Sequence, residues 1–212
     1  MQVRLYRRGG CYNRGVTTLE NQHRRSLRLR GYDYSQAGGY YLTIVTQGRE
    51  CLFGEIVGND MVLNEAGKMV AKWWNELPGK FPSVTADACV VMPNHFHGVV
   101  FIHDTTVGAD LRVGPGDMGN QNVMGKGAHI GAPLQPMPRP DAPLSQIVQW
   151  FKTMTTNEYI RGVKGMNWQP FIGKLWQRNY YEHIIRNEED YERIFNYIVT
   201  NPVNWGEDEE NR

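Results

Sequence analysis

Two β-branched segments separated by a short turn constrain the fold of this chain most strongly. The segments Val84–Met92 (VTADACVVM) and His97–His103 (HGVVFIH) are both rich in valine and other residues that favour strands. Pro93 and Asn94 lie between them, and both residue types are typical of a tight turn. We therefore expect two neighbouring antiparallel strands, and with them a fold that is based on an antiparallel sheet.

The remaining periodic segments extend this pattern to an α+β domain. In chain order the sequence first predicts a strand over 39–47, a helix over 65–77 after an N-cap at Asn64, and strands over 84–92 and 97–103. A helix from 144 to just before 162, a strand over 176–186 and a helix from about 188 to 201 follow. This β-α-β-β-α-β-α order is that of a ferredoxin-like sandwich, an antiparallel sheet with helices on one face, followed by an extra C-terminal helix.

Three segments fall outside the domain that residues 31–205 are expected to form. Residues 1–30 contain eight arginines and one acidic residue, which fits either a flexible arm that binds nucleic acid or a solvated leader. Residues 104–143 hold seven glycines and six prolines, and we interpret them as a mobile loop or insertion. The acidic residues 206–212 are expected to be a solvated tail.

Composition excludes several classes of protein. No apolar run approaches the roughly 18–20 residues that span a bilayer, and the N-terminus is basic and polar rather than of signal-peptide type. The three cysteines are widely spaced and contain no CxxC pair, which argues against a disulfide scaffold and against a cysteine zinc site. We expect a protein of the reducing cytoplasm with no membrane partner.

His95 and His97 flank Phe96 at the start of the third expected strand. Residues two apart on a strand point to the same face, so the two imidazoles lie side by side while Phe96 points to the opposite face. Such a pair can supply two nitrogen ligands to a divalent ion. A pair of surface histidines is the other interpretation, and the spacing alone does not decide between them.

The final helix contributes a second group of polar side chains. Its core-facing residues, at positions i, i+3, i+4 and i+7, are Tyr191, Ile194, Phe195 and Ile198. Tyr197 lies at the edge of this apolar stripe, and Asn201 follows one turn later on the same face. The two residues fit a compact site beside the histidines, and they equally fit an amphipathic helix with a boundary tyrosine.

Three blocks of sequence, in order, are similar to one known family. They are RRSLRLRGYDYSQAGGYYLTIVTQGRECLFGEI with NEAGKMV, then MPNHFHGVV, and then LWQRNYYEHIIRNEEDYERIFNYIVTNPVNW. Through these blocks the chain closely resembles the REP-associated tyrosine transposases, which are relatives of the single-tyrosine HUH transposases. The resemblance covers most of the chain apart from the Gly/Pro-rich segment and the extreme termini.

This resemblance implies a ferredoxin-like HUH domain that cleaves single-stranded DNA and recognises hairpins of repetitive extragenic palindromes. By position, His95 and His97 match the pair that binds a divalent cation, usually Mg²⁺ or Mn²⁺. Tyr197 matches the nucleophile, and Asn201 matches the polar residue that completes the protein ligands of the metal. The implied activity is metal-dependent cleavage and strand transfer through a covalent 5′-phosphotyrosine intermediate, carried out by a monomer or a homodimer.

Two further sets of residues complete the predicted site. Asn201 precedes Pro202, which biases it away from helical geometry, and His183 is the second candidate ligand if the Asn201 amide points elsewhere. A hydrogen-bonded strand histidine is the simpler role for His183. The candidate DNA contacts, which would make binding sensitive to salt, are Arg24, Arg25, Arg28, Arg30, Lys152, Arg178 and Arg186.

Two other functions remain compatible with the same residues. The first is a binding module of this fold that holds structured DNA or RNA without cutting it. The second is a metal-dependent hydrolase that uses an activated water on RNA or on a small phosphate ester. The three functions differ in whether a covalent adduct forms, and in whether turnover survives the loss of Tyr197.

Overall fold

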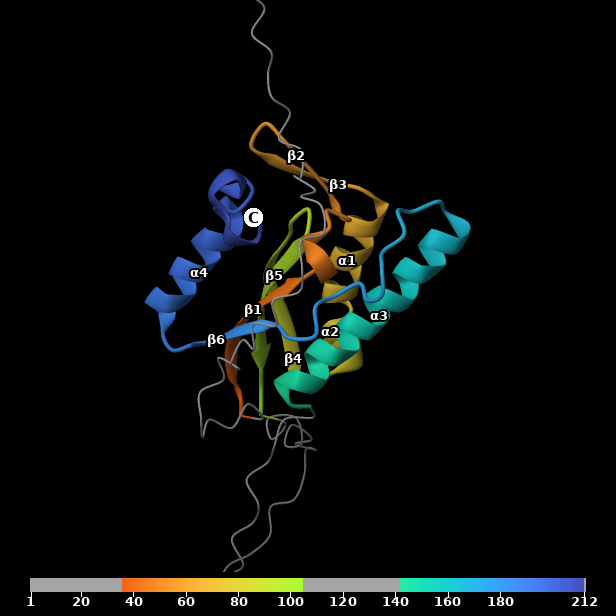
Figure 1. Cartoon of the computed structure of the whole chain (residues 1–212). Coiled ribbons are helices and arrows are strands. Elements are labelled where there is room, and N and C mark those ends of the chain that lie inside the picture. The colour runs from red at the N-terminus through yellow and green to blue at the C-terminus, as the bar shows by residue number, and fades with distance from the viewer. Residues whose placement is uncertain (1–35, 105–141, 212) are drawn as a thin grey trace, which may run out of the picture.

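The computed structural model of the protein describes residues 36–104 and 142–211. Its centre is a four-stranded antiparallel sheet in the order β4-β5-β1-β6 (Figure 1). The strands are β1 (Gly38–Val45), β4 (Val84–Val91), β5 (His95–Ile102) and β6 (Tyr181–Ile185). Together with the intervening helices they form the α+β fold predicted from the sequence, with the expected antiparallel pairing of β4 and β5.

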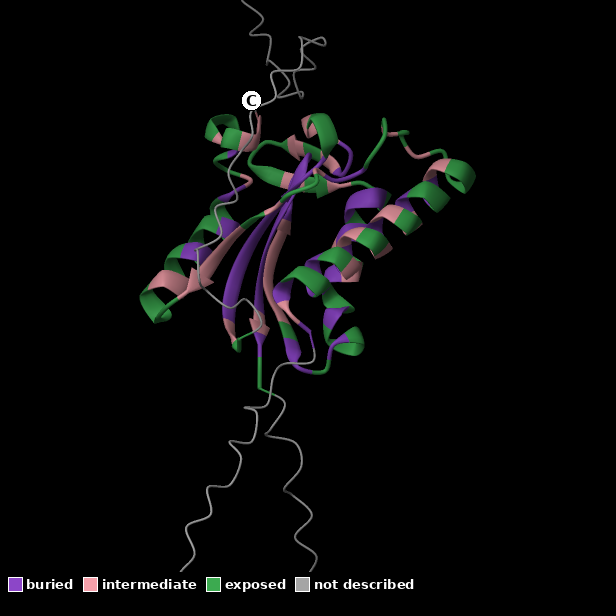
Figure 2. Cartoon of the chain, turned by 60° about the horizontal axis from the view of Figure 1, so that its bottom comes forward, coloured by how far each residue is buried: buried purple, intermediate pink, exposed green. Residues whose placement is uncertain are grey.

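Helices cover both faces of this sheet. Helices α1 (Glu65–Asn75), α2 (Leu77–Lys80) and α3 (Leu144–Gly165) lie on one face, and α4 (Glu188–Thr200) lies on the other (Figures 1 and 2). Asn64 caps α1 as expected, because its side chain accepts a hydrogen bond from the Gly67 amide. The sheet thus separates a large core beneath α1 and α3 from a smaller layer beneath α4.

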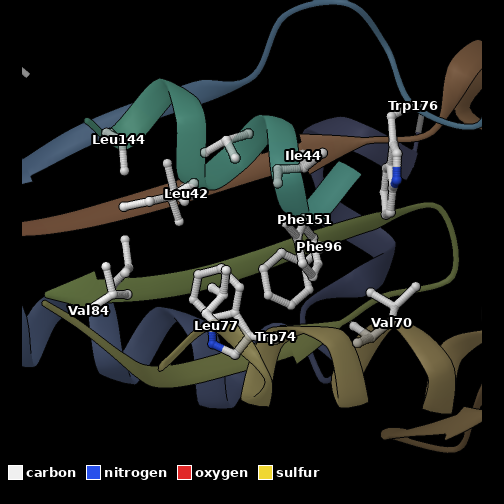
Figure 3. Packing of buried hydrophobic residues seen from close by; sticks show 14 of the residues in the cluster. Leu42, Ile44, Val70, Trp74, Leu77, Val84, Phe96, Leu144, Phe151 and Trp176 are labelled. Carbon is white, nitrogen blue, oxygen red and sulfur yellow. The ribbon is translucent and has the colours of Figure 1, made fainter. Parts of the chain in front are cut away.

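The large core anchors the strand that carries the two histidines. Phe96 points away from them into this core, where its ring centroid lies 4.8 Å from that of Trp74 and 5.1 Å from that of Phe151 (Figure 3). All three side chains are buried. Because protein interiors are closely packed, this contact fixes the position of β5 and hence of His95 and His97 on the opposite face.

Gly98→Ala tests how closely β5 is packed. A Cβ atom at Gly98 would lie 2.6 Å from Trp74 Cζ2, so the substitution is expected to lower the free energy of unfolding by about 1–3 kcal/mol. Urea denaturation followed by tryptophan fluorescence measures this change. Gly165→Ala is the matched control, because its added Cβ meets no heavy atom within 4 Å apart from its chain neighbours and the backbone of its own helix. Equal stability of the two variants would contradict the packing argument.

Several element boundaries differ from the sequence-based expectation. A β-hairpin of β2 (Gly54–Val57) and β3 (Asp60–Leu63) precedes α1, where the sequence predicted no paired strands. Strand β6 covers only the second half of the segment expected from 176 to 186. Strand β5 begins at His95, two residues earlier than expected, so that both histidines belong to the strand.

Some expectations fall on residues that the structure does not describe. These are the basic arm over 1–30 and nearly all of the Gly/Pro-rich segment over 104–143, which stay predictions. Within 36–104 and 142–211, no helix is long and apolar enough to cross a membrane.

Candidate functional site

The two histidines of β5 face helix α4 on the side of the sheet opposite to Phe96. They pair with Val45 and Thr43 of β1, and their ring centroids are 4.4 Å apart. Both side chains are buried, and among the described residues neither Nε2 atom has a hydrogen-bond partner. Two buried ring nitrogens without hydrogen-bond partners, side by side, are costly unless a ligand satisfies them.

The other nitrogen of each ring is hydrogen-bonded within the protein. His95 Nδ1 lies 2.8 Å from Asn94 Oδ1. His97 Nδ1 lies 2.7 Å from the Tyr41 hydroxyl and 2.9 Å from the Thr43 hydroxyl. Histidines that bind metals commonly have such a bond at the distal nitrogen, because it orients the ring.

Burial keeps both rings neutral. It lowers the pKa of His95 to about 4, although the nearby Asp208 carboxylate opposes the shift. Burial likewise holds the pKa of His97 well below its usual range, and the neighbouring His95 adds to this effect. Neutral imidazole is the form that ligates a metal, so the burial of this pair favours metal binding over proton binding at neutral pH.

Helix α4 brings Tyr197 and Asn201 to the histidines. The Tyr197 ring centroid lies 5.3 Å from that of His97, and the residue is 45% exposed. Asn201 keeps helical backbone angles in spite of Pro202, and it is only 2% exposed. Its Oδ1 is a third buried acceptor without a partner among the described residues. The tyrosine is therefore accessible beside a cluster of potential ligands.

The acidic segment after α4 is not a solvated tail. It folds back over the site as two short 3-10 helices, η3 (Trp205–Glu207) and η4 (Glu209–Asn211). The side chain of Asp208, between them, is only 4% exposed, and its Oδ2 lies 4.0 Å from His95 Nε2. The Glu210 carboxylate forms an ion pair with Arg49 at 2.9 Å, which holds the segment against the turn that follows β1.

Asp208 turns the histidine pair into a group that could hold a metal ion. One ligand atom from each of His95, His97 and Asp208 lies within 4.8 Å of the other two. Asn201 Nδ2 donates to Asp208 Oδ2 at 3.1 Å, which joins the amide to the same cluster. Two imidazole nitrogens with amide and carboxylate oxygens form a ligand set suited to a divalent ion.

The surroundings of Tyr197 disfavour its phenolate. Burial is the main cause of the raised pKa of its hydroxyl, and the negative charge of Asp208 adds to it, whereas a hydrogen bond from Asn201 acts in the opposite direction. Positive charge placed among the ligand atoms would oppose the effect of Asp208, because opposite charges nearby favour the ionised form. The ionisation of the Tyr197 hydroxyl thus depends on the charge in the neighbouring cluster.

His183 lies outside this cluster. Its Nε2 is 2.8 Å from Asp190 Oδ2, so it links β6 to the first turn of α4. This contact lowers the pKa of Asp190 to about 2. This geometry supports the role of a hydrogen-bonded strand histidine for His183, rather than that of a second candidate ligand.

The candidate DNA contacts are dispersed. Arg178 is exposed and precedes the end of β6 that pairs with Thr43, near the histidines. Arg186 is also exposed, but it follows the opposite end of β6, roughly 15 Å along the strand. The four arginines from Arg24 to Arg30 lie outside the described residues.

Lys152 is engaged within the protein. Its ammonium donates to the backbone carbonyls of Gln177, Arg178 and Asn179 at 2.9, 3.3 and 3.3 Å, which uses all three of its N–H donors. Burial lowers its pKa to about 8. These bonds hold the segment that carries Arg178, and the expected contact of Lys152 with a DNA phosphate stays a prediction.

The sequence-based prediction missed four residues that contact the candidate ligands. Tyr41 and Thr43 alternate along β1, and their period of two could have indicated a shared face, but not which strand they would pair with. Asn94 was assigned only to a turn. Asp208 gave no signal, because an acid among other acids at the end of a domain fits a solvated surface equally well.

Comparison with known proteins places this geometry in context. No family model matches the sequence. A solved structure of a REP-associated tyrosine transposase bound to a REP hairpin aligns with 84% of this chain and 74% of its own, with a TM-score of 0.51 and 19% sequence identity. The protein thus has the fold of a REP-associated tyrosine transposase, which confirms at the level of fold the resemblance predicted from the sequence.

A closer relative is found in sequence. An uncharacterized protein of Haemophilus influenzae is 36% identical over 204 residues, which cover 93% of this chain and 96% of the relative. The chain belongs to the same family as this Haemophilus protein.

Proposed function

We propose that this protein is a metal-dependent single-stranded DNA endonuclease and strand transferase that acts on palindromic hairpin DNA. Tyr197 is the covalent nucleophile, and His95, His97 and Asn201 hold the metal. The observation that carries the proposal is a buried group of His95, His97 and Asp208, with ligand atoms within 4.8 Å of one another, that lies beside a solvent-accessible tyrosine and is joined to the Asn201 amide. The transposase fold supports the reaction class, and the ligand set supports Mg²⁺ or Mn²⁺ as the cofactor.

The proposed reaction divides the work between the tyrosine and the ligands. The Tyr197 hydroxyl loses its proton, and its oxygen forms a bond to the scissile phosphorus while the bond to the 3′ oxygen breaks. The 3′ oxygen takes up a proton, and the 5′ phosphate remains on the tyrosine, ready for rejoining. A divalent ion at this site would supply positive charge that polarises the phosphate oxygens and favours the phenolate. Asn201, one helical turn from Tyr197, orients the ligands and the nucleophile together.

The proposed substrate is an unpaired strand attached to a hairpin. Tyr197 is exposed at the surface, so a flexible strand can bring one phosphate to it. Arg178 is placed to contact phosphates at this end of β6, and Arg186 and the arginines of the basic arm would contact DNA farther from the site. We further propose that the protein acts in the cytoplasm as a monomer or a homodimer.

The direct test is the formation of a covalent adduct. Purified protein is incubated with a labelled single-stranded hairpin that carries unpaired flanks of random sequence, in Mn²⁺, in Mg²⁺ or in EDTA, and the products are separated on a denaturing gel. We expect a labelled protein band that requires metal, together with a shortened DNA that ends in a 3′ hydroxyl. Sequencing of that DNA gives the position of cleavage.

Other outcomes identify the two alternative functions. Salt-sensitive hairpin binding without an adduct in any metal would identify a non-cleaving module that binds structured DNA or RNA. Turnover that needs His95 but survives the loss of Tyr197 would identify a hydrolase that uses activated water.

Asp208→Asn tests whether the folded-back segment contributes to the metal site. The substitution keeps the shape of the side chain and removes its charge, so we expect the dissociation constant for Mn²⁺ to rise about tenfold or more. Isothermal titration calorimetry measures this constant. Glu209→Gln, an equal change of charge at an exposed neighbouring position, is the matched control and should leave it unchanged. If both variants bind Mn²⁺ as the wild type does, Asp208 is not part of the metal site.

A further inference from the structure

The amide of Asn94 has an orientation that its neighbours determine. Asn94 is 2% exposed and lies in the turn between β4 and β5. Its Nδ2 donates to the backbone carbonyl of Glu210 at 2.7 Å and to that of Arg49 at 3.3 Å. Carbonyl oxygens only accept hydrogen bonds, so the nitrogen of the amide must lie on their side. The oxygen Oδ1 must then face His95.

This orientation determines where His95 carries its proton. Asn94 Oδ1 is 2.8 Å from His95 Nδ1, and an amide oxygen can only accept. In the neutral ring that a metal ligand requires, Nδ1 must therefore be the protonated nitrogen. The lone pair is left on Nε2, which points toward Asp208 and His97.

Asn94 and Asp208 have opposite effects on the tautomer of His95. Asp208 Oδ2 lies 4.0 Å from His95 Nε2, and a carboxylate at this position favours a proton on Nε2. A proton on Nε2 would remove the lone pair that a metal needs. Asn94 and Asp208 thus favour opposite tautomers of His95, and only the one that Asn94 favours leaves a lone pair on Nε2, the nitrogen that faces Asp208.

His97 has no comparable constraint. Its Nδ1 faces the hydroxyl groups of Tyr41 and Thr43, and a hydroxyl can either donate or accept. These partners orient the ring but do not by themselves select its tautomer. The partner of His95 Nδ1 differs in this respect, because the Asn94 amide oxygen can accept a hydrogen bond but cannot donate one.

We propose that Asn94 is a positioning residue that holds His95 in the Nδ1–H tautomer and so presents the Nε2 lone pair to a divalent cation. The tautomer itself follows from contacts within the protein, and only its purpose rests on the proposed function. Because the Glu210 carbonyl helps to orient the Asn94 amide, the folded-back segment takes part in this selection.

The tautomer can be measured directly in metal-free protein. Protein labelled with ¹⁵N at histidine is studied by long-range ¹H–¹⁵N correlation NMR near neutral pH, which distinguishes protonated from unprotonated ring nitrogens. We expect His95 of the wild type to carry its proton on Nδ1. A wild-type His95 that carries its proton on Nε2 would overturn the inference without any variant.

Two substitutions separate selection of the tautomer from a merely structural role. Asn94→Asp keeps an oxygen that only accepts beside Nδ1 but loses both donated bonds, so His95 should remain Nδ1–H even if the protein becomes less stable. Asn94→Ala removes the acceptor, and the proton should move to Nε2 under the influence of Asp208. Asn75→Ala, at an exposed position of α1, is the control and should leave the spectrum unchanged. A His95 tautomer that is unchanged in Asn94→Ala would contradict the proposal.

The affinity for Mn²⁺ connects the tautomer to the proposed function. Asn94→Ala should weaken Mn²⁺ binding about 10- to 100-fold, as measured by electron paramagnetic resonance of the free ion, whereas Asn94→Asp should keep most of the affinity. A wild type that binds no Mn²⁺ would refute the metal site of the proposed function and leave the tautomer result intact. Wild-type affinity in Asn94→Ala would instead refute the positioning role while the metal site stands.

Discussion

Replacing Tyr197 with phenylalanine is expected to lower the yield of covalent protein–DNA adduct by more than about 10³-fold. The change removes one oxygen and keeps the ring, so the contacts of the ring with His97 and Tyr41 and the position of α4 should persist. Hairpin binding should remain within about twofold of the wild type. The denaturing-gel assay measures the adduct, and fluorescence anisotropy of a labelled hairpin measures the binding.

Two other tyrosines lie near Tyr197 and provide the controls for this result. Tyr41 is 7% exposed, and burial raises the pKa of its hydroxyl far above the usual value, while His97 holds that hydroxyl in a hydrogen bond. Tyr181 is exposed and contacts the ring of Tyr41, which in turn stacks on His97. We expect Tyr181→Phe to keep the adduct. An adduct that persists in Tyr197→Phe and disappears in Tyr181→Phe would assign the nucleophile to the strand instead of the helix.

The second large effect is expected from His97→Ala. The Nε2 atom of His97 is one of the buried unpartnered nitrogens, and its removal takes away a proposed direct metal ligand. We expect the affinity for Mn²⁺ to fall by more than about 100-fold, beyond the effect typical of residues that only orient a ligand. Adduct formation should fall with it and should recover in part at high Mn²⁺ concentration.

The control for His97→Ala must separate metal binding from stability. The substitution also leaves the hydroxyls of Tyr41 and Thr43 without their buried partner, which costs about 1–3 kcal/mol of stability. Thermal unfolding therefore accompanies each titration. His103→Ala, at an exposed histidine just beyond the same strand, should change neither quantity. Unchanged Mn²⁺ affinity in a folded His97→Ala protein would show that the metal, if bound, lies elsewhere.

The sequence was sufficient for the part of the site that regular secondary structure determines. The period of a strand places His95 and His97 on one face, and the period of a helix places Tyr197 and Asn201 on another. Each pair could be predicted because its members are close in the chain. That the two pairs face each other rested on a resemblance to a family, since no local pattern relates β5 to α4 across about one hundred residues.

The remaining parts of the site depend on contacts that local patterns do not encode. Asp208 reaches the histidines because the chain turns back after Asn201 and because Glu210 pairs with Arg49. Both contacts join segments that are distant in the sequence, and a run of acids carries no sign of which one is buried. The role of Asn94 was hidden for the same reason, since the orientation of its amide is set by the distant carbonyls of Arg49 and Glu210.

The attachment of α4 at several points along its length has a consequence for the choice of substrate. Near its start, Asp190 binds His183 and the Tyr191 hydroxyl donates to Asp87. In its middle, Ile194 and Ile198 pack on the sheet. At its end, Asn201 donates to Asp208. A helix held in this way cannot carry its tyrosine to a distant phosphate, so in the proposed reaction the DNA must adapt its own shape. Bending paired DNA by 40–90° within 20–30 base pairs costs on the order of 1–6 kcal/mol, whereas an unpaired strand turns at much lower cost. The proposed preference for single strands would then follow from the stiffness of the substrate rather than from its base sequence.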